Sequence, residues 1–176
     1  MFRDDDGLRK VFDLRSPHQI LEKLRWETTL IHAMLPQEPK VIFAAFNAAA
    51  TAWHLTEWVI EVWDDLPIQA VSRENYRNDV VKRCPNLEIC RQISVGWKHR
   101  VVKQRNDPAV QASHLIKLYV RVEDGKLIDG PPTRVERSPA IFVGTHHFEL
   151  DAFFDRLVNF WTEELDRLRI DASFAL

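Results

Sequence analysis

The sequence AFNAAATAW, residues 45–53, decides how this chain folds. It lies at the centre of a predicted helix over about residues 40–65, where alanine favours the helix and lets neighbouring backbones approach closely. At about 100° per residue, one strip of this helix carries its polar positions and a tryptophan. The strip consists of Asn47, Thr51, His54, Trp58 and Glu61. Most of the remaining circumference is apolar, so the sequence predicts a central helix with one polar seam.

Further helices are expected on both sides of this one. Ser16 is placed to cap a helix that starts at Pro17 and stops at Pro36. A last helix carries apolar residues at helical spacing, and Glu163 is expected to pair with Arg167 on its polar face. The expected bounds of the three later helices are 72–83, 86–105 and 150–169.

A change of period marks a small sheet before the last helix. Apolar residues alternate with polar ones over residues 116–123, and Asp124-Gly125 is a strong hairpin signal. The return strand is expected over 126–128, and a third short strand over 140–143. The β insertion is therefore expected to span 115–144.

These patterns predict a mainly α fold: an antiparallel bundle of four to five helices with a small antiparallel sheet inserted before the last helix. At 176 residues and 45% hydrophobic content, a single domain over 1–176 is expected, with residues 1–15 as a flexible segment. The acidic N-terminus and the short apolar runs favour a cytoplasmic protein with no membrane span. Cys84 and Cys90 are interpreted as reduced thiols.

Positive charge is concentrated in one part of the chain. Residues 77–105 contain eight lysines and arginines against two acids, a net charge of +6, so with −2 overall the rest of the chain carries −8. Such a segment is typical either of a surface for a polyanion such as RNA or of a solvated helix face. Both interpretations stay open from charge alone.

The basic segment also contains groups that can perform chemistry. A histidine such as His99 can transfer a proton near neutral pH, and an arginine such as Arg91 can hold a phosphate or stabilise a developing negative charge. Lys98 adds a further cation beside them. Together they suffice for cutting RNA without a metal, and no cofactor is expected. The alternative is that Arg91 forms a salt bridge and His99 caps exposed backbone.

Two segments resemble the HEPN superfamily of helical proteins, which includes many metal-independent ribonucleases of toxin and defence systems. FNAAATAWHLTEW, residues 46–58, is similar to the long central helix of these proteins, and CRQISVGWKH, residues 90–99, is similar to their motif helix. The resemblance implies an RNA- or nucleotide-associated protein that forms a homodimer with the two motif helices facing each other.

If the chain is catalytic, His99 is expected to act as general acid or base, Arg91 to stabilise the phosphate, and Lys98 to assist electrostatically. Seven residues separate Arg91 from His99, whereas catalytic members of the superfamily have four to six. A non-catalytic, binding member is therefore an equal alternative. The further residues expected to contribute to binding are Arg100, Lys103, Asn47, His54, Glu57 and Trp58.

Two other functions compete with RNA binding. One is a metal-dependent helical-bundle enzyme built on His54-x-x-Glu57, with Glu61 and a ligand from His146, His147, Glu149 or Asp151. The simpler interpretation of those residues is hydrogen bonding along the seam and exposed acids, and no metal site is assigned. The other is a non-catalytic protein-interaction module that uses the aromatic seam of the central helix.

Overall fold

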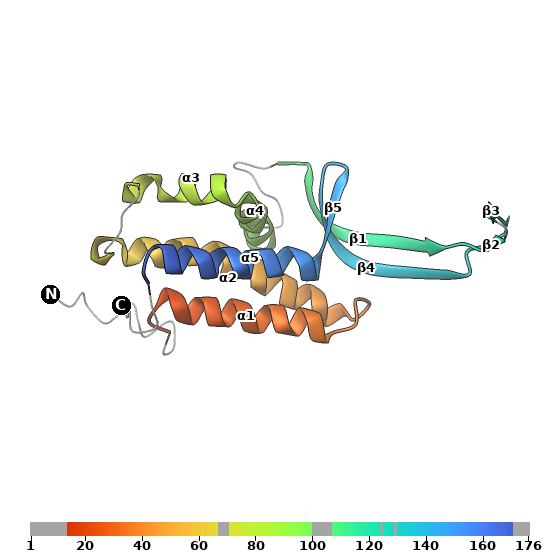
Figure 1. Ribbon diagram of the computed structural model, residues 1–176, viewed down its shortest axis with the longest axis horizontal. Coiled ribbons are helices and arrows are strands. Elements are labelled where there is room, and N and C mark those ends of the chain that lie inside the picture. The colour runs from red at the N-terminus through yellow and green to blue at the C-terminus, as the bar shows by residue number, and fades with distance from the viewer. Residues whose placement is uncertain (1–13, 67–70, 100–106, 124, 129, 171–176) are drawn as a thin grey trace.

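The computed structural model describes residues 14–66, 71–99, 107–123, 125–128 and 130–170. Within these ranges it contains five α-helices and a three-stranded antiparallel sheet that precedes the last helix, as the sequence predicted (Figure 1). The helices are α1 (Pro17–Ala33), α2 (Pro39–Glu61), α3 (Arg73–Arg83), α4 (Asn86–His99) and α5 (Leu150–Arg167), and a short 3-10 turn, η2 (Trp63–Asp65), follows α2. The expected flexible segment, residues 1–15, lies almost entirely outside the described residues.

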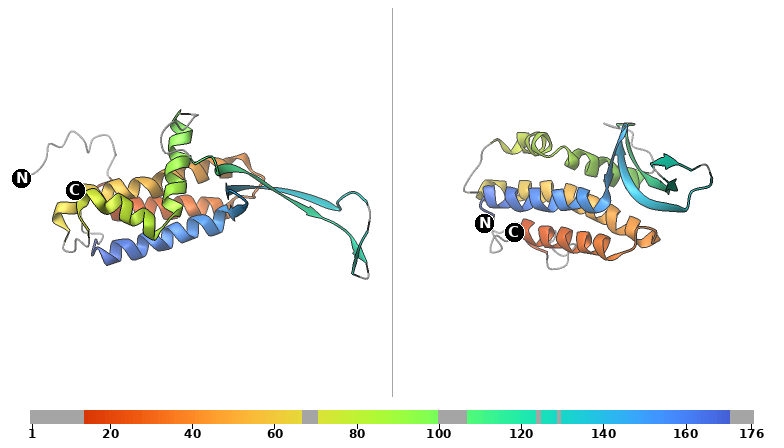
Figure 2. Two further views of the ribbon diagram at one scale, coloured as in Figure 1. Left: turned by 90° about the horizontal axis from the view of Figure 1, so that it is seen from above. Right: turned by 45° about the vertical axis from the view of Figure 1, so that its right-hand side comes forward.

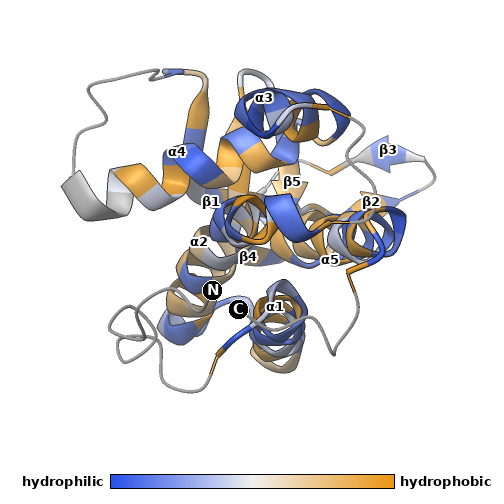
Figure 3. Cartoon of the chain, turned by 90° about the vertical axis from the view of Figure 1, so that its left-hand side faces the viewer, coloured by the Kyte–Doolittle hydropathy of each residue, from blue (hydrophilic) through white to orange (hydrophobic). Residues whose placement is uncertain are grey.

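Helix α2 occupies the centre, where α1, α4 and α5 all contact it. Its alanines Ala48, Ala49 and Ala52 have no exposed surface, which is how the neighbouring helices come close. Trp161 of α5 donates from Nε1 to the carbonyl of Ala52 at 3.0 Å, so a bulky ring packs directly on the small residues. Figure 3 looks along the helices and shows apolar and polar residues on the same helices.

The predicted polar seam of α2 divides into two parts. Asn47, His54 and Glu61 are exposed, but Thr51 is only 5% exposed and accepts a hydrogen bond from Lys23 of α1 at 2.6 Å. Lys23 also pairs with the buried Glu27. The seam is therefore partly a helix–helix contact, because α1 covers the middle of the strip.

The sheet has the strand order β1-β4-β5, from β1 (Val110–Tyr119), β4 (Arg134–Val143) and β5 (His146–Glu149). All ten residues of β1 pair with β4, whereas β5 pairs only with residues 140–143 of β4. Two further short strands, β2 (Val122–Glu123) and β3 (Lys126–Leu127), form a separate ribbon around Gly125, whose φ of 74° suits glycine.

The described residues between 115 and 138, that is 115–123, 125–128 and 130–138, therefore form an arm that projects away from the helices (Figures 1 and 2). Of the turn predicted at 124–125, Gly125 lies between β2 and β3, and Asp124 lies outside the described residues. The expected return strand at 126–128 contributes only the two residues of β3. The long partner of β1 is β4, which starts after the loop containing Pro131 and Pro132. The sheet spans 110–149, which is wider than the predicted insertion at 115–144.

Two other expectations can be compared with the described residues. None of the helices in those ranges has the length and apolar character required to cross a membrane. Cys84 and Cys90 are both buried free thiols, and burial raises the pKa of each.

Candidate functional site

The two segments that resemble HEPN proteins lie next to each other and line one groove. The groove has a volume of about 640 Å³ and lies between α2, α3 and α4. Helix α2 contributes Trp53 and Glu57, while α4 contributes Glu88 and Arg91. The lining from α3 consists of Glu74, Arg77, Asn78, Val81 and Lys82. Two residues assigned to a site from the sequence, Glu57 and Arg91, are thus brought together.

The arginines of the groove are held by carboxylates. The Arg91 side chain is only 12% exposed, and its Nε lies 3.0 Å and 2.9 Å from the two oxygens of Glu88, with Nη2 at 2.6 Å from Oε1. Arg77 forms an ion pair with Glu57 across the groove. These contacts orient two guanidinium groups towards one space between three helices.

The formal charges of the groove balance, with three cations and three acids among its lining residues. Lys82 is exposed and has no ion-pair partner among the residues that the structure describes. Glu74 is exposed, and hydrogen bonds from its own backbone N–H and from Ser72 lower its pKa. A phosphate that binds Arg77 or Arg91 must therefore displace a carboxylate, and it can then bind the arginine through two hydrogen bonds at once.

The remaining basic residues predicted for the site lie outside the described side chains. Arg100 and Lys103 fall in an undescribed segment, and only the backbone is described at Lys98 and His99. Helix α4 runs unbroken to His99. Position 99 therefore lies about 80° around the axis and about 12 Å along it from position 91, as expected for eight residues of helix.

The other predicted binding residues do not line the groove. Asn47 and His54 are exposed on α2, and Trp58 is partly buried against the hydrophobic core. Sequence reasoning missed Arg77, Lys82 and Glu88 as lining residues. The density of positive charge over residues 77–105 pointed to Arg77 and Lys82, and the i,i+3 spacing from Arg91 on the same helix was the available signal for Glu88.

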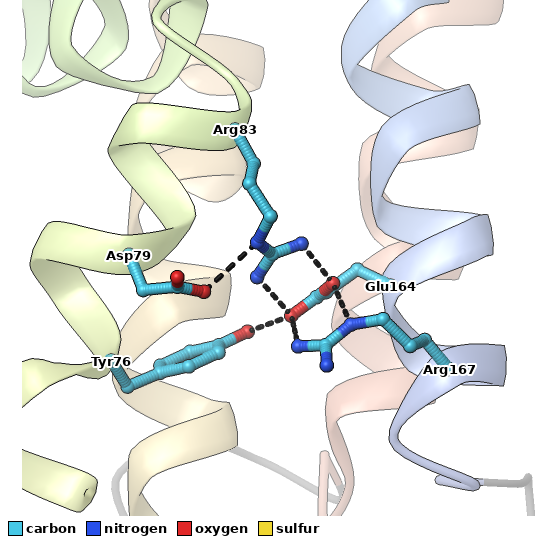
Figure 4. Close-up of polar contacts among 5 residues, drawn as sticks. All are labelled: Tyr76, Asp79, Arg83, Glu164 and Arg167. Atoms are coloured by element: carbon cyan, nitrogen blue, oxygen red, sulfur yellow. Dashed lines mark hydrogen bonds and ion pairs between the residues drawn. The ribbon is translucent and has the colours of Figure 1, made fainter. Parts of the chain in front are cut away.

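A buried ionic cluster joins α3 to α5 (Figure 4). Glu164 of α5 is only 2% exposed and receives hydrogen bonds from Tyr76, Arg83 and Arg167. The hydroxyl of Tyr76 lies 3.0 Å from Glu164, and the two arginines approach its oxygens to between 2.5 and 2.9 Å. Asp79 binds the other side of the Arg83 guanidinium at 2.9 Å.

Electrostatics keep this buried carboxylate charged. Burial by itself would raise the pKa of Glu164, but the hydrogen bonds and charges of Arg167 and Arg83 outweigh it and lower the pKa. Burial and the charge of Glu164 raise the pKa of Tyr76, so the phenol remains a donor. The cluster fixes α3, and α3 supplies one wall of the groove.

The pairing of Arg167 was predicted wrongly. The sequence suggested Glu163, but Arg167 binds Glu164, and Glu163 is exposed. The reason is that Glu164 follows Trp161 at helical spacing and so falls on the buried face. An acid on an apolar face was the available signal, since such a charge requires partners.

The metal-dependent alternative has no ligand set in the described part of the chain. No group of three or more His, Cys, Asp or Glu side chains able to hold a metal occurs there. Glu57 is paired with Arg77, and the side chains of His146 and His147 are exposed on β5.

Comparisons with protein-family models, curated proteins and solved structures found no match to this chain. The relationship to HEPN proteins therefore stays a prediction from the two sequence segments.

Proposed function

We propose that the protein binds RNA or a nucleotide through the groove between α2, α3 and α4, with Arg77 and Arg91 as phosphate ligands. The observation that supports it most is that the two HEPN-like segments, which are more than thirty residues apart, line the same groove. If either resemblance were due to chance, there would be no reason to expect the two segments to line the same groove. Three basic residues of the segment 77–105, Arg77, Lys82 and Arg91, also line this groove.

The lining residues suggest how a nucleotide is held. A phosphate displaces Glu57 or Glu88 and binds the guanidinium that the carboxylate had kept in place. Lys82 adds a cation at the edge, and Trp53, which is partly exposed at the groove, offers an aromatic ring to a base. Binding should weaken as salt rises, because each phosphate contact releases counterions.

RNA cleavage is the stronger form of this proposal. A ribose 2′-hydroxyl would lose its proton and attack the adjacent phosphorus, and the bond to the 5′ oxygen would break as that oxygen gains a proton. We assign one of these proton transfers to His99, stabilisation of the charged phosphorus centre to Arg91, and electrostatic assistance to Lys98.

The setting of this activity is also a proposal. We propose that the helices form an antiparallel bundle and that the protein is cytoplasmic, where RNA is abundant and buried thiols such as Cys84 and Cys90 stay reduced.

Binding is tested by fluorescence anisotropy with a short labelled single-stranded RNA in EDTA. Arg91→Ala should raise the Kd about tenfold, equivalent to roughly 1.4 kcal/mol, and should reduce the slope of log Kd against log salt by about 0.7 for each phosphate that the variant no longer neutralises. The matched control is Arg25→Ala, which removes an arginine paired with Glu22 on α1. Equal affinity in all three proteins would contradict the proposal.

Cleavage is tested with the same RNA in EDTA and followed on a denaturing gel. His99→Ala should abolish product formation, and Arg91→Ala should reduce it at saturating RNA. Cleavage that is unchanged in both variants would remove the catalytic assignment. If the wild type binds RNA without cutting it, the protein is a non-catalytic RNA-binding protein.

A second candidate function is protein binding, which the arm favours. Six aliphatic side chains along the arm and at its tip are between 39% and 58% exposed, an unusual concentration for a surface in water. They are Ile116, Leu118, Val120, Val122, Ile128 and Val135.

A further inference from the structure

We infer that the apolar face of the arm is covered by the same face of a second copy of this chain. The inference deepens the protein-binding function and does not depend on RNA binding.

The register of β1 and β4 divides the arm into two faces of different chemistry. Residues directly paired across the two strands share a face. Leu118 pairs with Val135 and Ile116 with Arg137, so these four residues lie on one face. Lys117 pairs with Glu136, and Tyr119 pairs with Arg134, on the opposite face. The first is called the apolar face and the second the polar face.

The polar face is suited to water. Lys117 donates to Glu149 at 2.6 Å, and the hydroxyl of Tyr119 donates to Glu136 at 2.8 Å. The guanidinium of Arg134 lies 5.5 Å from the centre of the Tyr119 ring. On the apolar face, by contrast, the aliphatic side chains of Ile116, Leu118 and Val135 are 54%, 58% and 58% exposed.

The apolar face is the outward continuation of a core face. Further inward, Ala112 pairs with Ile141 on the same side of the sheet, and Ile141 is only 2% exposed where the helices cover it. The alternation of the strands continues past the end of this cover. A two-stranded ribbon is only marginally stable in water, so a face of this composition requires something to pack on it.

The exposed area matches what a pair of these arms needs. A half-exposed valine, leucine or isoleucine presents roughly 90 Å² of accessible surface. The three aliphatic residues that the register places on the apolar face, Ile116, Leu118 and Val135, therefore present about 270 Å² per copy, and a pair of arms reaches about 1,000 Å² when the exposed residues at the tips, Val120, Val122 and Ile128, join the contact. That is near the minimum for a specific interface. Arg137 is the single cation among the four paired residues of the apolar face, so charge selects neither a nucleic acid nor a strongly acidic protein.

A two-fold axis makes the apolar face complementary to itself. With the axis at Leu118 and Val135, residues at equal distances inward and outward face each other.

Oligomeric state is measured on the full chain by sedimentation equilibrium. The wild type should be a dimer at micromolar concentration, and Leu118→Glu with Val135→Glu should raise the dimer dissociation constant at least a hundredfold. Phe43→Glu, which changes an equally exposed residue on α2, is the control and should leave it unchanged. Far-UV circular dichroism checks that each variant keeps its helices.

Cysteine cross-linking tests the geometry. Leu118→Cys should form an intermolecular disulfide under mild oxidation, because the axis brings the two copies of position 118 together, whereas Lys117→Cys on the polar face should not. The inference is overturned by a monomer at all concentrations, by a dimer that the charged substitutions leave intact, or by equal cross-linking at both positions. A monomer that captures another protein through the arm would overturn self-association and leave the protein-binding function standing.

Discussion

Helix α5 and strand β1 each present one apolar face, but only the face of α5 is covered by the rest of the chain. Leu157 and Trp161 of α5 have no exposed surface, whereas Ile116 and Leu118 of β1 are more than half exposed. Both faces have the regular periodicity that predicts burial. Periodicity therefore identifies an apolar face, but it does not tell whether the rest of the same chain covers that face.

The polar contacts of the two regions differ in the same way. The ion pairs of the helices include a buried cluster around Glu164, while those of the arm, such as Lys117–Glu149, lie at the surface. A surface pair contributes little because water and salt screen it. The stability of the chain should therefore depend on the helices, and the arm should depend on association.

A large effect is expected when the buried cluster loses its charge. Glu164→Gln removes the buried carboxylate that Arg83 and Arg167 share. Because the two arginine side chains are 34% and 36% exposed, water compensates for part of the loss, so the free energy of unfolding should fall by about 3 kcal/mol, the lower end expected for a broken buried pair. Urea denaturation followed by circular dichroism measures it. Glu163→Gln, one residue away and exposed, should change stability by less than about 0.5 kcal/mol. Equal effects at both positions would show that the cluster is not a major source of stability.

The same substitution in the two apolar faces sharpens the comparison. Leu157→Ala creates a cavity among the helices and should lower the free energy of unfolding by about 2 to 5 kcal/mol. Leu118→Ala on the arm should cost less than about 0.5 kcal/mol when measured at a concentration where the protein is monomeric. A large loss from Leu118→Ala in the monomer would mean that the arm face is already covered by this chain.

Acid should reveal the cluster through its pKa. The folded pKa of Glu164 lies below its ordinary value near 4.5, so its stabilisation is fully present above about pH 5 and is lost as pH falls through the folded pKa. Stability measured from pH 7 downwards should therefore decline below about pH 5. In Glu164→Gln the decline should be shallower, because one titrating group has been removed. If stability declines equally with falling pH in the wild type and in Glu164→Gln, the lowered pKa of Glu164 is contradicted.

The smallest effect is expected at an exposed contact between α1 and α5. The hydrogen bond to Asp155 raises the pKa of His32 above its ordinary value of 6.5. Its stabilisation is present below pH 6.5 and is lost as pH rises through the folded pKa. NMR titration of the imidazole should give a pKa that falls towards 6.5 in Asp155→Asn. An unchanged pKa would mean that Asp155 does not act on this imidazole in solution.

The helices were predictable because their ends carry local signals. Ser16 caps α1 by accepting from the backbone N–H of Gln19 at 3.2 Å, as its spacing from Gln19 indicated. Proline starts α2 as it starts α1. The strand β4 was predicted only in its last four residues, because its first six contain three charged residues and Pro139. These residues form a strand because they pair with β1, and a pairing between distant segments is not visible in the local sequence.

The candidate site was predictable only one helix at a time. Arg91 and Glu57 were selected from their own segments, and the structure places both in one groove. Arg77, which holds Glu57, became visible only when α2 and α3 packed together, whereas Glu88, three residues before Arg91 on α4, forms the salt bridge that the sequence offered as the alternative for Arg91. The roles of His99 and Lys98 stay predictions, since their side chains lie outside the described residues.

The most direct test of the account follows deuterium uptake by the β1 peptide as protein concentration rises. If a second copy covers the apolar face and steadies the ribbon, amides between Ile116 and Tyr119 should exchange at least tenfold more slowly in the dimer than in the dilute monomer, while those of α5 should exchange equally in both. Exchange of the β1 amides that does not depend on concentration would contradict it.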